Sequence, residues 1–282
     1  MSPKIEYISC MSANYIARQL DYNMTEGWGQ GQTSLEAWFG PEPTFAHRFD
    51  ELCAEIAKLG FNAIDLYTGH LNPLTASEAM LTAAQAVLTR HGLTVISFAG
   101  GLGNTAEEVS RSAEVATKFG ATLWGGSAGF LKADRARFTA ILREHGLKFG
   151  VENHPKEKTS QDLLAVMGEG DEDVIGAAID TGWFATNGFS NPQAIRDVSA
   201  RVFYVHLKDI LKPDASNPGK TLQSIGHETC ALGEGVVGIE DCLSALGEIG
   251  YEGSLSIEHE PEFHNPNDDL RTSLERVRQW LS

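Results

Sequence analysis

The stretch LKFGVENHP, residues 147–155, shows the pattern that predicts the fold. An apolar, strand-like run ends in a carboxylate, an amide and an imidazole, and a proline then stops the strand. A strand with this ending either reaches the protein surface or delivers its polar groups into a site. One stretch cannot separate these two explanations, so the rest of the chain has to decide between them.

Short β-rich runs alternate with longer amphipathic segments along the chain, and a glycine commonly closes the amphipathic segment. The predicted strands lie at residues 5–9, 62–67, 93–98, 121–126, 147–152, 174–180, 201–206 and 254–258. Alternation of this kind predicts parallel strands with helical crossovers. Eight such units in 282 residues fit one (β/α)8 TIM barrel domain over residues 1–282, since such barrels typically have about 250 residues.

A doubly wound open sheet is the rival fold. It usually carries a phosphate-binding glycine turn after its first strand. The corresponding stretch here, CMSANY at residues 10–15, is not such a turn. The barrel is therefore the predicted fold.

Two connections after predicted strands are long, at residues 10–44 and 208–236. Loops beyond about 15 residues are usually functional or disordered, and loops that follow barrel strands lie at the catalytic face. Trp28, Trp38 and Phe39 in the first connection predict a lid that packs over a site. The same aromatic residues would alternatively form a contact between subunits of a homo-oligomer.

Composition limits the partners and the compartment. The chain has 22 Lys and Arg against 38 Asp and Glu, a formal net charge of −16. Nucleic-acid binders need basic surface, so DNA or RNA is not an expected partner. No uncharged apolar window reaches about 18 residues, so no membrane span is expected. The start, MSPKIEYISC, does not resemble a signal peptide, and the four cysteines lack metal-type spacing. We expect a cytoplasmic protein with reduced thiols.

Four predicted strands end in potential metal ligands, namely Glu152, Asp180, His206 and Glu258. The intervals between them are 28, 26 and 52 residues, which correspond to one β/α unit, one unit, and one unit plus the second long connection. Because adjacent barrel strands end around a common mouth, we expect three carboxylates and one imidazole to converge there. A structural role would suffice for any one of these residues alone, but not for all four at successive strand ends.

Converging carboxylates repel one another and lose hydration, and a divalent cation offsets both effects. Oxygen-rich ligation with a single nitrogen favours a hard or borderline ion, such as Mn²⁺ or Mg²⁺, over a thiolate-type zinc site. The sequence therefore predicts a divalent metal site at these strand ends.

Two residues lie two positions beyond predicted metal ligands, so strand alternation aims them into the same mouth. His154 would bind a substrate hydroxyl or act as an acid, unless it caps the following loop. Lys208 would neutralise an enediolate or a carboxylate, unless it pairs with Asp209 or Glu234 instead.

Four further features are weaker candidates. His70 follows the second predicted strand and would line the opposite wall, and Trp183 would stack on the C–H face of a sugar or pack under the lid. Glu260 alternates with Glu258, as a partner for a histidine ligand or as a solvated charge. The stretch GGLGN, residues 100–104, precedes a helix as phosphate loops do, but no P-loop lysine follows it.

The chain resembles the xylose isomerase-like barrel superfamily, in its sugar phosphate isomerase/epimerase branch. That branch includes inosose dehydratases and isomerases, hydroxypyruvate isomerases and ketose 3-epimerases. The matching stretches are VENHP (151–155), IDTGW (179–183), VHLKD (205–209) and LGEGVVGIEDCLSALGEIGYEGSLSIEHEPE (232–262). The resemblance covers nearly the whole chain in rhythm and is most specific in the last 135 residues.

The resemblance implies one divalent ion, Mn²⁺ first and Mg²⁺, Co²⁺ or Zn²⁺ as alternatives, held by Glu152, Asp180, His206 and Glu258. It also implies a keto-sugar or cyclitol substrate, with Glu152 and Glu258 moving the proton. Ketose 3-epimerases carry a histidine where this chain has Trp183. They also carry an arginine after the histidine of the seventh strand, where this chain reads LKDIL instead. These departures weaken a ketohexose 3-epimerase assignment and leave the inosose-type members as the better match. The superfamily's zinc-dependent DNA-repair endonucleases need basic surface, which this acidic chain lacks.

A divalent ion between two carboxylates suits proton abstraction next to a carbonyl. One of Glu152 and Glu258 would remove the proton to form a metal-stabilised enediolate, and the other would return a proton, giving epimerisation or isomerisation. If a leaving group lies β to the carbanion, the same intermediate eliminates it, so a lyase or dehydratase is the first alternative. A metal-dependent hydrolase and a non-catalytic sugar-binding barrel also remain, because the fold does not choose among them.

Overall fold

Eight parallel strands close into a barrel at the centre of the protein. The computed structural model describes residues 2–211 and 228–282. The barrel strands are β1 (Ile8–Met11), β2 (Ala63–Tyr67), β3 (Thr94–Gly101), β4 (Leu123–Ser127), β5 (Lys148–Glu152), β6 (Ile175–Asp180), β7 (Val202–Leu207) and β10 (Leu255–Ile257). Each strand pairs with the next along the chain, and β1 closes the ring on β10. The predicted (β/α)8 TIM barrel is confirmed.

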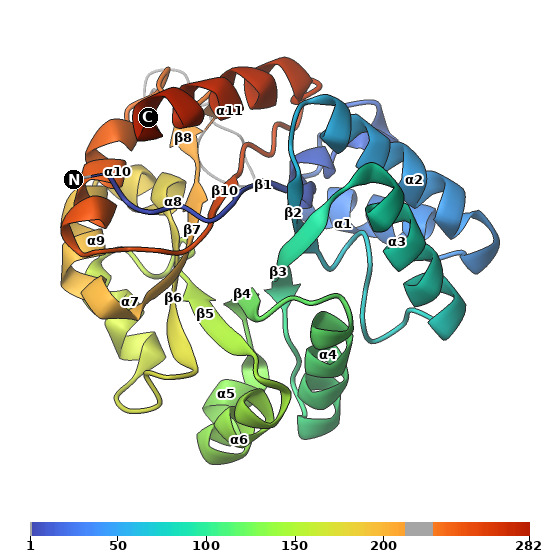
Figure 1. Ribbon diagram of the computed structural model, residues 1–282, viewed down its shortest axis with the longest axis horizontal. Helices are drawn as coiled ribbons and strands as arrows, with labels where there is room; N and C mark the ends of the chain where they lie inside the picture. Colours follow the sequence, from blue (N-terminus) through green and yellow to red (C-terminus); the bar gives the residue numbers. More distant parts are fainter. Residues whose placement is uncertain (1, 212–227) are drawn as a thin grey trace.

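Helices form the outer ring around these strands (Figure 1). The helices that follow barrel strands are α2 (Glu42–Lys58), α3 (Glu78–His91), α4 (Ala106–Lys118), α6 (Arg135–His145), α7 (Ser160–Met167), α9 (Asn191–Val198), α10 (Ile239–Glu248) and α11 (Asn267–Leu281). Helix α2 buries one apolar face, which consists of Phe45, Phe49, Leu52, Cys53 and Ile56. Side-chain caps start several of these helices, as where Ser77 accepts the Met80 N–H.

The first long connection is a packed segment rather than a bare loop. It contains two 3₁₀ turns, Ser12–Tyr15 and Arg18–Leu20, and helix α1 (Trp28–Phe39). Leu35 and Phe39 of α1 are buried in the main core. Gly31 packs so closely that an added Cβ would lie 2.6 Å from both Ile16 and Met24. The sequence did not predict this helix because its first half, with two glycines, has low helix propensity.

The second long connection is only partly described, since residues 212–227 of the predicted segment 208–236 lie outside the described residues. Its two ends pair as a short antiparallel ribbon of β8 (Asp209–Ile210) and β9 (Thr229–Cys230). Two short helices, α5 (Gly129–Ala133) and α8 (Thr181–Thr186), begin directly after β4 and β6.

The first strand is displaced from its predicted position at residues 5–9. The N–H groups of Lys4 and Glu6 donate to the carbonyls of Tyr251 and Gly253, and barrel pairing begins only at Ile8. The chain therefore runs beside the segment that precedes β10 before it enters the sheet.

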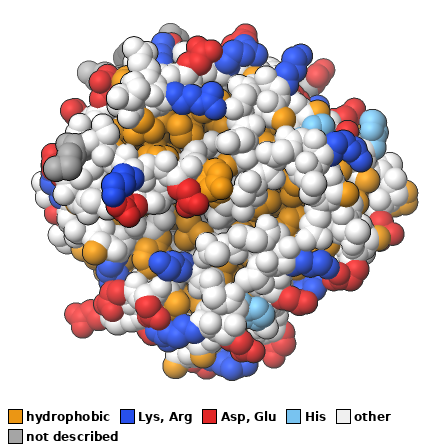
Figure 2. All heavy atoms as spheres, viewed as in Figure 1, with side chains coloured by type: hydrophobic (Ala, Val, Ile, Leu, Met, Phe, Trp, Pro, Cys, Tyr) orange, Lys and Arg blue, Asp and Glu red, His pale blue; other side chains and the backbone are white. Residues whose placement is uncertain are grey.

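The surface is charged and mixed. Acidic and basic side chains alternate around the periphery of the face in Figure 2, and hydrophobic side chains gather nearer its centre. Within the described ranges, every helix is too short or too polar to cross a membrane.

Candidate active site

A cavity of about 380 Å³ opens where the barrel strands end. Its lining includes Met11, Ala13, Trp28, Tyr67, Gly100, Gly126, Glu152, His154, Trp183, Lys208, Glu258 and Glu260. A larger hollow of about 690 Å³ lies at the opposite end, beside strand starts such as Thr94 and Val202. The described residues that line this larger hollow include no histidine. The smaller cavity is therefore the candidate active site, because predicted site residues such as Glu152, His154 and Glu258 line it.

Glu152, Asp180, His206 and Glu258 come together at this cavity, and we call them the strand-end cluster. Each offers one ligand atom, and these atoms all lie within 4.8 Å of one another. Strand register explains the convergence, because Asp180 is the direct partner of His206 across β6 and β7. The Glu258 N–H donates to the Leu207 carbonyl at 3.0 Å, which aligns the end of β10 with the end of β7.

His206 is fully buried, and both of its ring nitrogens face carboxylates. Nδ1 lies 2.9 Å from Glu152 Oε1 and 3.0 Å from Glu258 Oε2, while Nε2 lies 3.1 Å from an oxygen of Asp65. Burial opposes protonation, but Glu258 and Glu152 outweigh it and raise the pKa of His206 well above its ordinary value. A nitrogen between two carboxylate oxygens needs a proton or a metal ion there to offset the repulsion.

Asp65 is a candidate site residue that the sequence pattern did not indicate. It is fully buried in β2, and its Oδ2 faces His206 Nε2 while also accepting a hydrogen bond from the Tyr204 hydroxyl. Its Oδ1 accepts a hydrogen bond from Ser97 Oγ at 2.8 Å. This arrangement holds the imidazole with Nε2–H on Asp65 and Nδ1 directed at the carboxylates, as partners of metal-binding histidines do. The available signal was a carboxylate inside the apolar run NAIDLY, residues 62–67.

Two buried carboxylate oxygens of the strand-end cluster, Asp180 Oδ2 and Glu258 Oε2, have no hydrogen-bond donor within the described residues. Lys208 Nζ lies 3.1 Å from the first, and His206 Nδ1 lies 3.0 Å from the second, but neither is aligned as a hydrogen-bond donor. Burial raises the pKa of Asp180 to about 6, and Lys208 offsets part of this effect. Buried oxygens left in this way fit a divalent ion.

Lys208 is a buried positive charge beside the strand-end cluster. Its Nζ donates to Glu260 Oε2 at 2.9 Å, and it lies 3.1 Å from Asp180 Oδ2 and 3.4 Å from Glu258 Oε1. Burial alone would lower the pKa of Lys208, but these three carboxylates raise it well above its ordinary value. The ammonium group therefore stays charged at the cavity wall.

Two alternatives considered from the sequence are wrong. The Asp209 carboxylate accepts backbone N–H groups between β9 and α10 rather than pairing with Lys208. Glu234 instead pairs with Arg276 at 2.9 Å. Glu260 is not a solvated charge, because it is 6% exposed and accepts the hydrogen bond from Lys208.

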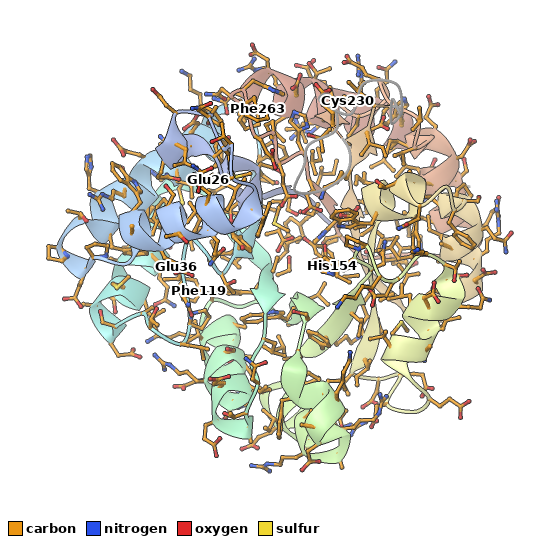
Figure 3. The ribbon with its side chains drawn as sticks, turned by 180° about the vertical axis from the view of Figure 1, so that it is seen from behind. Glu26, Glu36, Phe119, His154, Cys230 and Phe263 are labelled. Atoms are coloured by element: carbon orange, nitrogen blue, oxygen red, sulfur yellow. The ribbon has the colours of Figure 1, made fainter. Side chains whose placement is uncertain are left out.

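His154 and Trp183 both line the cavity, as predicted from their positions. His154 is 46% exposed, and its Nε2 lies 3.7 Å from Glu152 Oε2; it sits near the centre of the barrel in Figure 3. Trp183 is buried, with Lys208 Nζ lying 5.8 Å from its ring centroid. The Trp183 backbone N–H donates to Asp180 Oδ1 at 3.1 Å, so a member of the strand-end cluster holds the start of α8.

The sequence model of the family described as "Xylose isomerase-like TIM barrel" matches residues 53–280. The chain belongs to this family.

Several curated proteins are similar to this xylose isomerase-like barrel over part of their length. An uncharacterized protein of Methanocaldococcus jannaschii is 29% identical over 150 residues, 50% of this chain and 45% of that protein. The inosose dehydratase of Clostridium perfringens is 26% identical over 136 residues, 45% of this chain and 46% of that enzyme. The chain thus spans about half the length of these relatives.

Solved structures share the barrel over nearly the whole chain. The D-allulose 3-epimerase from Methylomonas sp. superposes with a TM-score of 0.68 at 15% identity, covering 99% of both chains. A xylose isomerase-like TIM barrel protein from Mycobacterium smegmatis, in complex with magnesium, gives 0.70 at 17% identity over 98% of this chain and 96% of that one. The probable 3-DHS dehydratase of Bacillus anthracis gives 0.64 at 15% identity over 96% and 98%. At these identities the likeness establishes the fold.

His70 does not lie where the sequence analysis expected it in this xylose isomerase-like barrel. It is buried outside the cavity, with its ring centroid 4.9 Å from that of Phe39 and 6.2 Å from that of Tyr67. Burial lowers the pKa of His70 to about 3, so the ring is neutral. His70 therefore packs against Phe39, from the segment predicted to be a lid, and does not line the cavity.

The wall opposite Lys208 is formed instead by α1 and by glycines of β3 and β4. Trp28 packs edge-on against Tyr67 with ring centroids 6.0 Å apart, and both line the cavity. Gly126 has φ 137°, and an added Cβ would lie 2.3 Å from the Gly100 carbonyl oxygen. Trp38 does not line the cavity; it is 40% exposed and stacks on Arg48. Of the three aromatics expected in the lid, Trp28 alone is among the cavity-lining residues.

The stretch GGLGN contributes glycines to the cavity wall, but its helix start is acidic. Helix α4 has Glu107 and Glu108 in its first turn, and the Asn104 N–H donates to Glu108 Oε2 at 2.7 Å. The negative charges of these two glutamates oppose the binding of a phosphate at this helix start.

Proposed function

We propose that this chain is a divalent-metal-dependent isomerase or epimerase of a keto-sugar or cyclitol, which removes a proton next to the carbonyl group. The observation that carries the proposal is the strand-end cluster, whose ligand atoms lie within 4.8 Å beside an open cavity. Glu152, Asp180, His206 and Glu258 would hold the ion. The similarity to a sugar epimerase and to a magnesium-bound barrel protein supports it.

A bound divalent ion polarises the substrate carbonyl and thereby acidifies the adjacent C–H bond. Glu152 and Glu258 carry out the proton transfer in this proposal. They belong to β5 and to the end of β10, which are separated by two strands in the ring, so they reach the cavity from different sides. One carboxylate takes the proton, and the other returns a proton to the opposite face of that carbon or to the neighbouring carbon.

Other cavity residues position and stabilise the substrate. The Lys208 ammonium group supplies a fixed positive charge for the enediolate oxygen, and its three carboxylate partners hold it in place. Trp28 and Trp183 offer apolar ring faces to the C–H bonds of a sugar or cyclitol. Asp65 acts through His206, whose ring it orients.

A dehydratase is the second candidate, favoured by the similarity to inosose dehydratases. In this reaction a glutamate takes the proton from the carbon next to the carbonyl, and the electron pair forms a C=C bond as the β C–O bond breaks. His154, half exposed and 3.7 Å from Glu152, would donate the proton with which the hydroxyl leaves as water. A metal-dependent hydrolase remains as a third candidate, with fewer suitable groups in the cavity.

Solvent isotope uptake tests the proposal. The protein loaded with Mn²⁺ is incubated in D₂O with a panel of ketoses and inososes, and products are followed by NMR and mass spectrometry. We expect deuterium at the carbon next to the carbonyl, together with an epimer or isomer. An unsaturated product that has lost water would identify the dehydratase instead. Turnover of a substrate with neither deuterium on carbon nor loss of water would reject both and favour the hydrolase.

A further inference from the structure

A second group of potential metal ligands lies outside the strand-end cluster. His259, His264 and Asp269, which we call the loop cluster, each offer a ligand atom within 4.8 Å of one another. Their side chains are 3%, 50% and 33% exposed, respectively. The group thus has a buried base and one side open to solvent, which gives an ion a path of entry.

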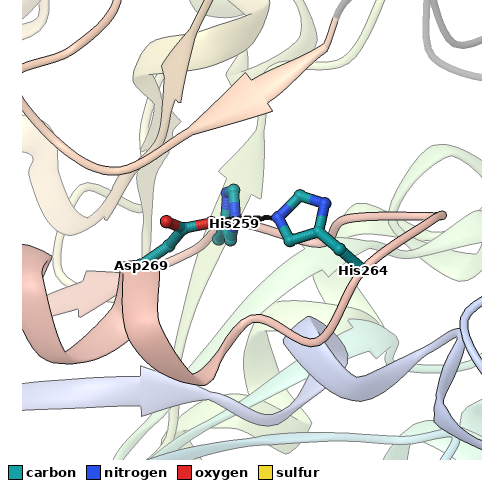
Figure 4. A group of neighbouring side chains, drawn as sticks. All are labelled: His259, His264 and Asp269. Carbon is teal, nitrogen blue, oxygen red and sulfur yellow. Dashed lines mark hydrogen bonds and ion pairs between the residues drawn. The ribbon is translucent and has the colours of Figure 1, made fainter.

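Strand geometry explains why His259 faces away from the cavity. Glu258 and Glu260 line the cavity, so the residue between them is directed to the other side of the chain. The His259 backbone N–H donates to Asn14 Oδ1 at 2.6 Å. Glu260 has φ 54°, a left-handed backbone conformation that is uncommon for residues other than glycine. Figure 4 shows His264 reaching in from the loop and Asp269 from the first turn of α11.

The distances within the loop cluster approach those of a tetrahedral site. The two Nε2 atoms lie 3.3 Å apart, which matches the edge of about 3.3 Å expected for ligands at zinc–nitrogen bond length. Asp269 Oδ2 lies 2.8 Å from His259 Nε2 and 2.9 Å from His264 Nε2. Asp269 Oδ2 would need to move about 0.5 Å away from the two nitrogens to reach the same tetrahedral edge length. The partial exposure of the Asp269 side chain allows this movement.

A hydrogen-bonded group without an ion is the competing explanation. In that case both imidazoles donate an N–H to the same oxygen of Asp269, so two N–H dipoles lie side by side. A cation would replace both protons and interact favourably with all three ligand atoms at once. Within the described residues, His259 Nδ1 has no hydrogen-bond partner, so the ring is anchored through Nε2.

We propose that the loop cluster is a second metal site, for a borderline divalent ion with Zn²⁺ as the first choice. Two imidazole nitrogens and one carboxylate, with a fourth position facing solvent, are a ligand set that Zn²⁺ prefers. The strand-end cluster offers one nitrogen and three carboxylates, which suit a harder ion. The two sites therefore select different metals, and this inference does not depend on the proposed function.

The ion would clamp the loop after β10 to α11. That loop carries Glu260 at the cavity, and its Glu262 carbonyl accepts the Met24 N–H at 3.2 Å. The connection through Met24 leads to α1, which forms the opposite wall of the cavity. Zinc binding is thus expected to stabilise the folded chain without adding a ligand to the substrate.

Metal stoichiometry tests the loop cluster. Chelator-treated protein is saturated with Zn²⁺ or with Mn²⁺, separated from free ion, and the bound metal is counted. We expect about one more Zn²⁺ per chain in the unmodified protein than in His264→Ala or Asp269→Asn, and equal Mn²⁺ in all three. His47→Ala is the matched control, because His47 is 80% exposed on α2 and its only described ion-pair partner is the neighbouring Glu51.

The difference of one zinc ion is the measured quantity, so failure of the strand-end cluster to bind metal would leave the test intact. Thermal unfolding supplies a second measurement, in which Zn²⁺ should raise the midpoint less in both variants than in the unmodified protein. Equal zinc counts and equal zinc-dependent shifts in the unmodified protein and both variants would overturn the proposal. His264 is half exposed, so its replacement is expected to leave the fold intact.

Discussion

The strand-end cluster and the loop cluster use similar side chains but are assembled in different ways. The first draws its ligands from four strand ends between residues 152 and 258, and the second from one short segment, residues 259–269. Hydrogen bonding between strands sets the distances in the first, whereas a loop and a helix start set them in the second. Strand pairing in the barrel thus fixes the positions of mutually repelling carboxylates. The loop cluster has no such strand pairing to fix its ligand positions.

The two clusters also differ in what surrounds them. Behind the strand-end cluster, Asp65 orients His206, and Lys208 balances three carboxylates in a buried setting. The loop cluster has one buried member, His259, and two that water reaches. Burial makes an unpaired group costly, so the same kind of substitution should have a larger effect in the strand-end cluster.

The largest effect is expected from replacing the two glutamates of the strand-end cluster. Glu152→Gln and Glu258→Gln keep the shape and one oxygen ligand but cannot accept the proton. Each should retain metal at raised concentration and lose at least about a hundredfold in kcat. Steady-state kinetics at saturating Mn²⁺ measures this loss, with exposed Glu252→Gln at the opposite end of the barrel as the control. Near-normal turnover in either metal-loaded variant would reject the two-carboxylate mechanism.

Asp65→Asn should separate the two clusters by metal type. Asparagine can still face His206, but it no longer offers a charged acceptor to the Nε2–H, so Mn²⁺ affinity should fall by about 10–100-fold. Zn²⁺ binding by the loop cluster should be unchanged. Calorimetric titration of each ion measures both effects, and Tyr204→Phe, which removes one donor to Asp65, should weaken Mn²⁺ binding less. Unchanged Mn²⁺ affinity in Asp65→Asn would show that the barrel alone orients the histidine.

Trp28→Ala tests whether α1 completes the site above the strand-end cluster. Loss of the aromatic face should raise KM by about tenfold, equivalent to about 1.4 kcal/mol, with a smaller change in kcat. Trp38→Ala is the matched control, since Trp38 lies on the same helix but stacks on Arg48 outside the cavity. Equal effects of both substitutions on KM would indicate that α1 acts through stability rather than substrate contact.

The smallest effect is expected at an ordinary surface ion-pair group, which gives a baseline for both clusters. Asp171 lies 2.9 Å from Arg135 and 2.7 Å from Arg143, and the hydrogen bond from Arg143 holds the pKa of Asp171 below its usual range. Asp171→Asn should lower the free energy of unfolding by about 0.5–1 kcal/mol at pH 7.

A depressed folded-state pKa contributes stability above the unfolded value of about 3.9. This contribution is lost as the pH falls through the folded-state pKa of Asp171. Urea unfolding of both proteins at several pH values between 7 and 3 should therefore show their difference shrinking at the acid end. A difference that persists unchanged in acid would assign the effect to packing rather than charge.

Alternation and spacing in the sequence were enough to predict the barrel and the convergence of the strand-end cluster. A closed parallel sheet directs every strand end to one rim, so Glu152, Asp180, His206 and Glu258 could be grouped from their positions alone. The same alternation placed His154 and Lys208 at the cavity, because neighbouring strand residues point to opposite sides. These inferences needed only periodicity, which is a local property of the chain.

Tertiary structure alone decided the contacts between segments without a shared period. The pairing of Asp65 with His206 joins β2 to β7 across the inside of the barrel. His70 lies outside the cavity and packs against Phe39 of a helix that the sequence did not predict. His259 and Asp269 meet because the chain bends at Glu260 and because α11 begins where it does. Periodicity determines which way a side chain points along its own element, but packing between elements determines what it meets there.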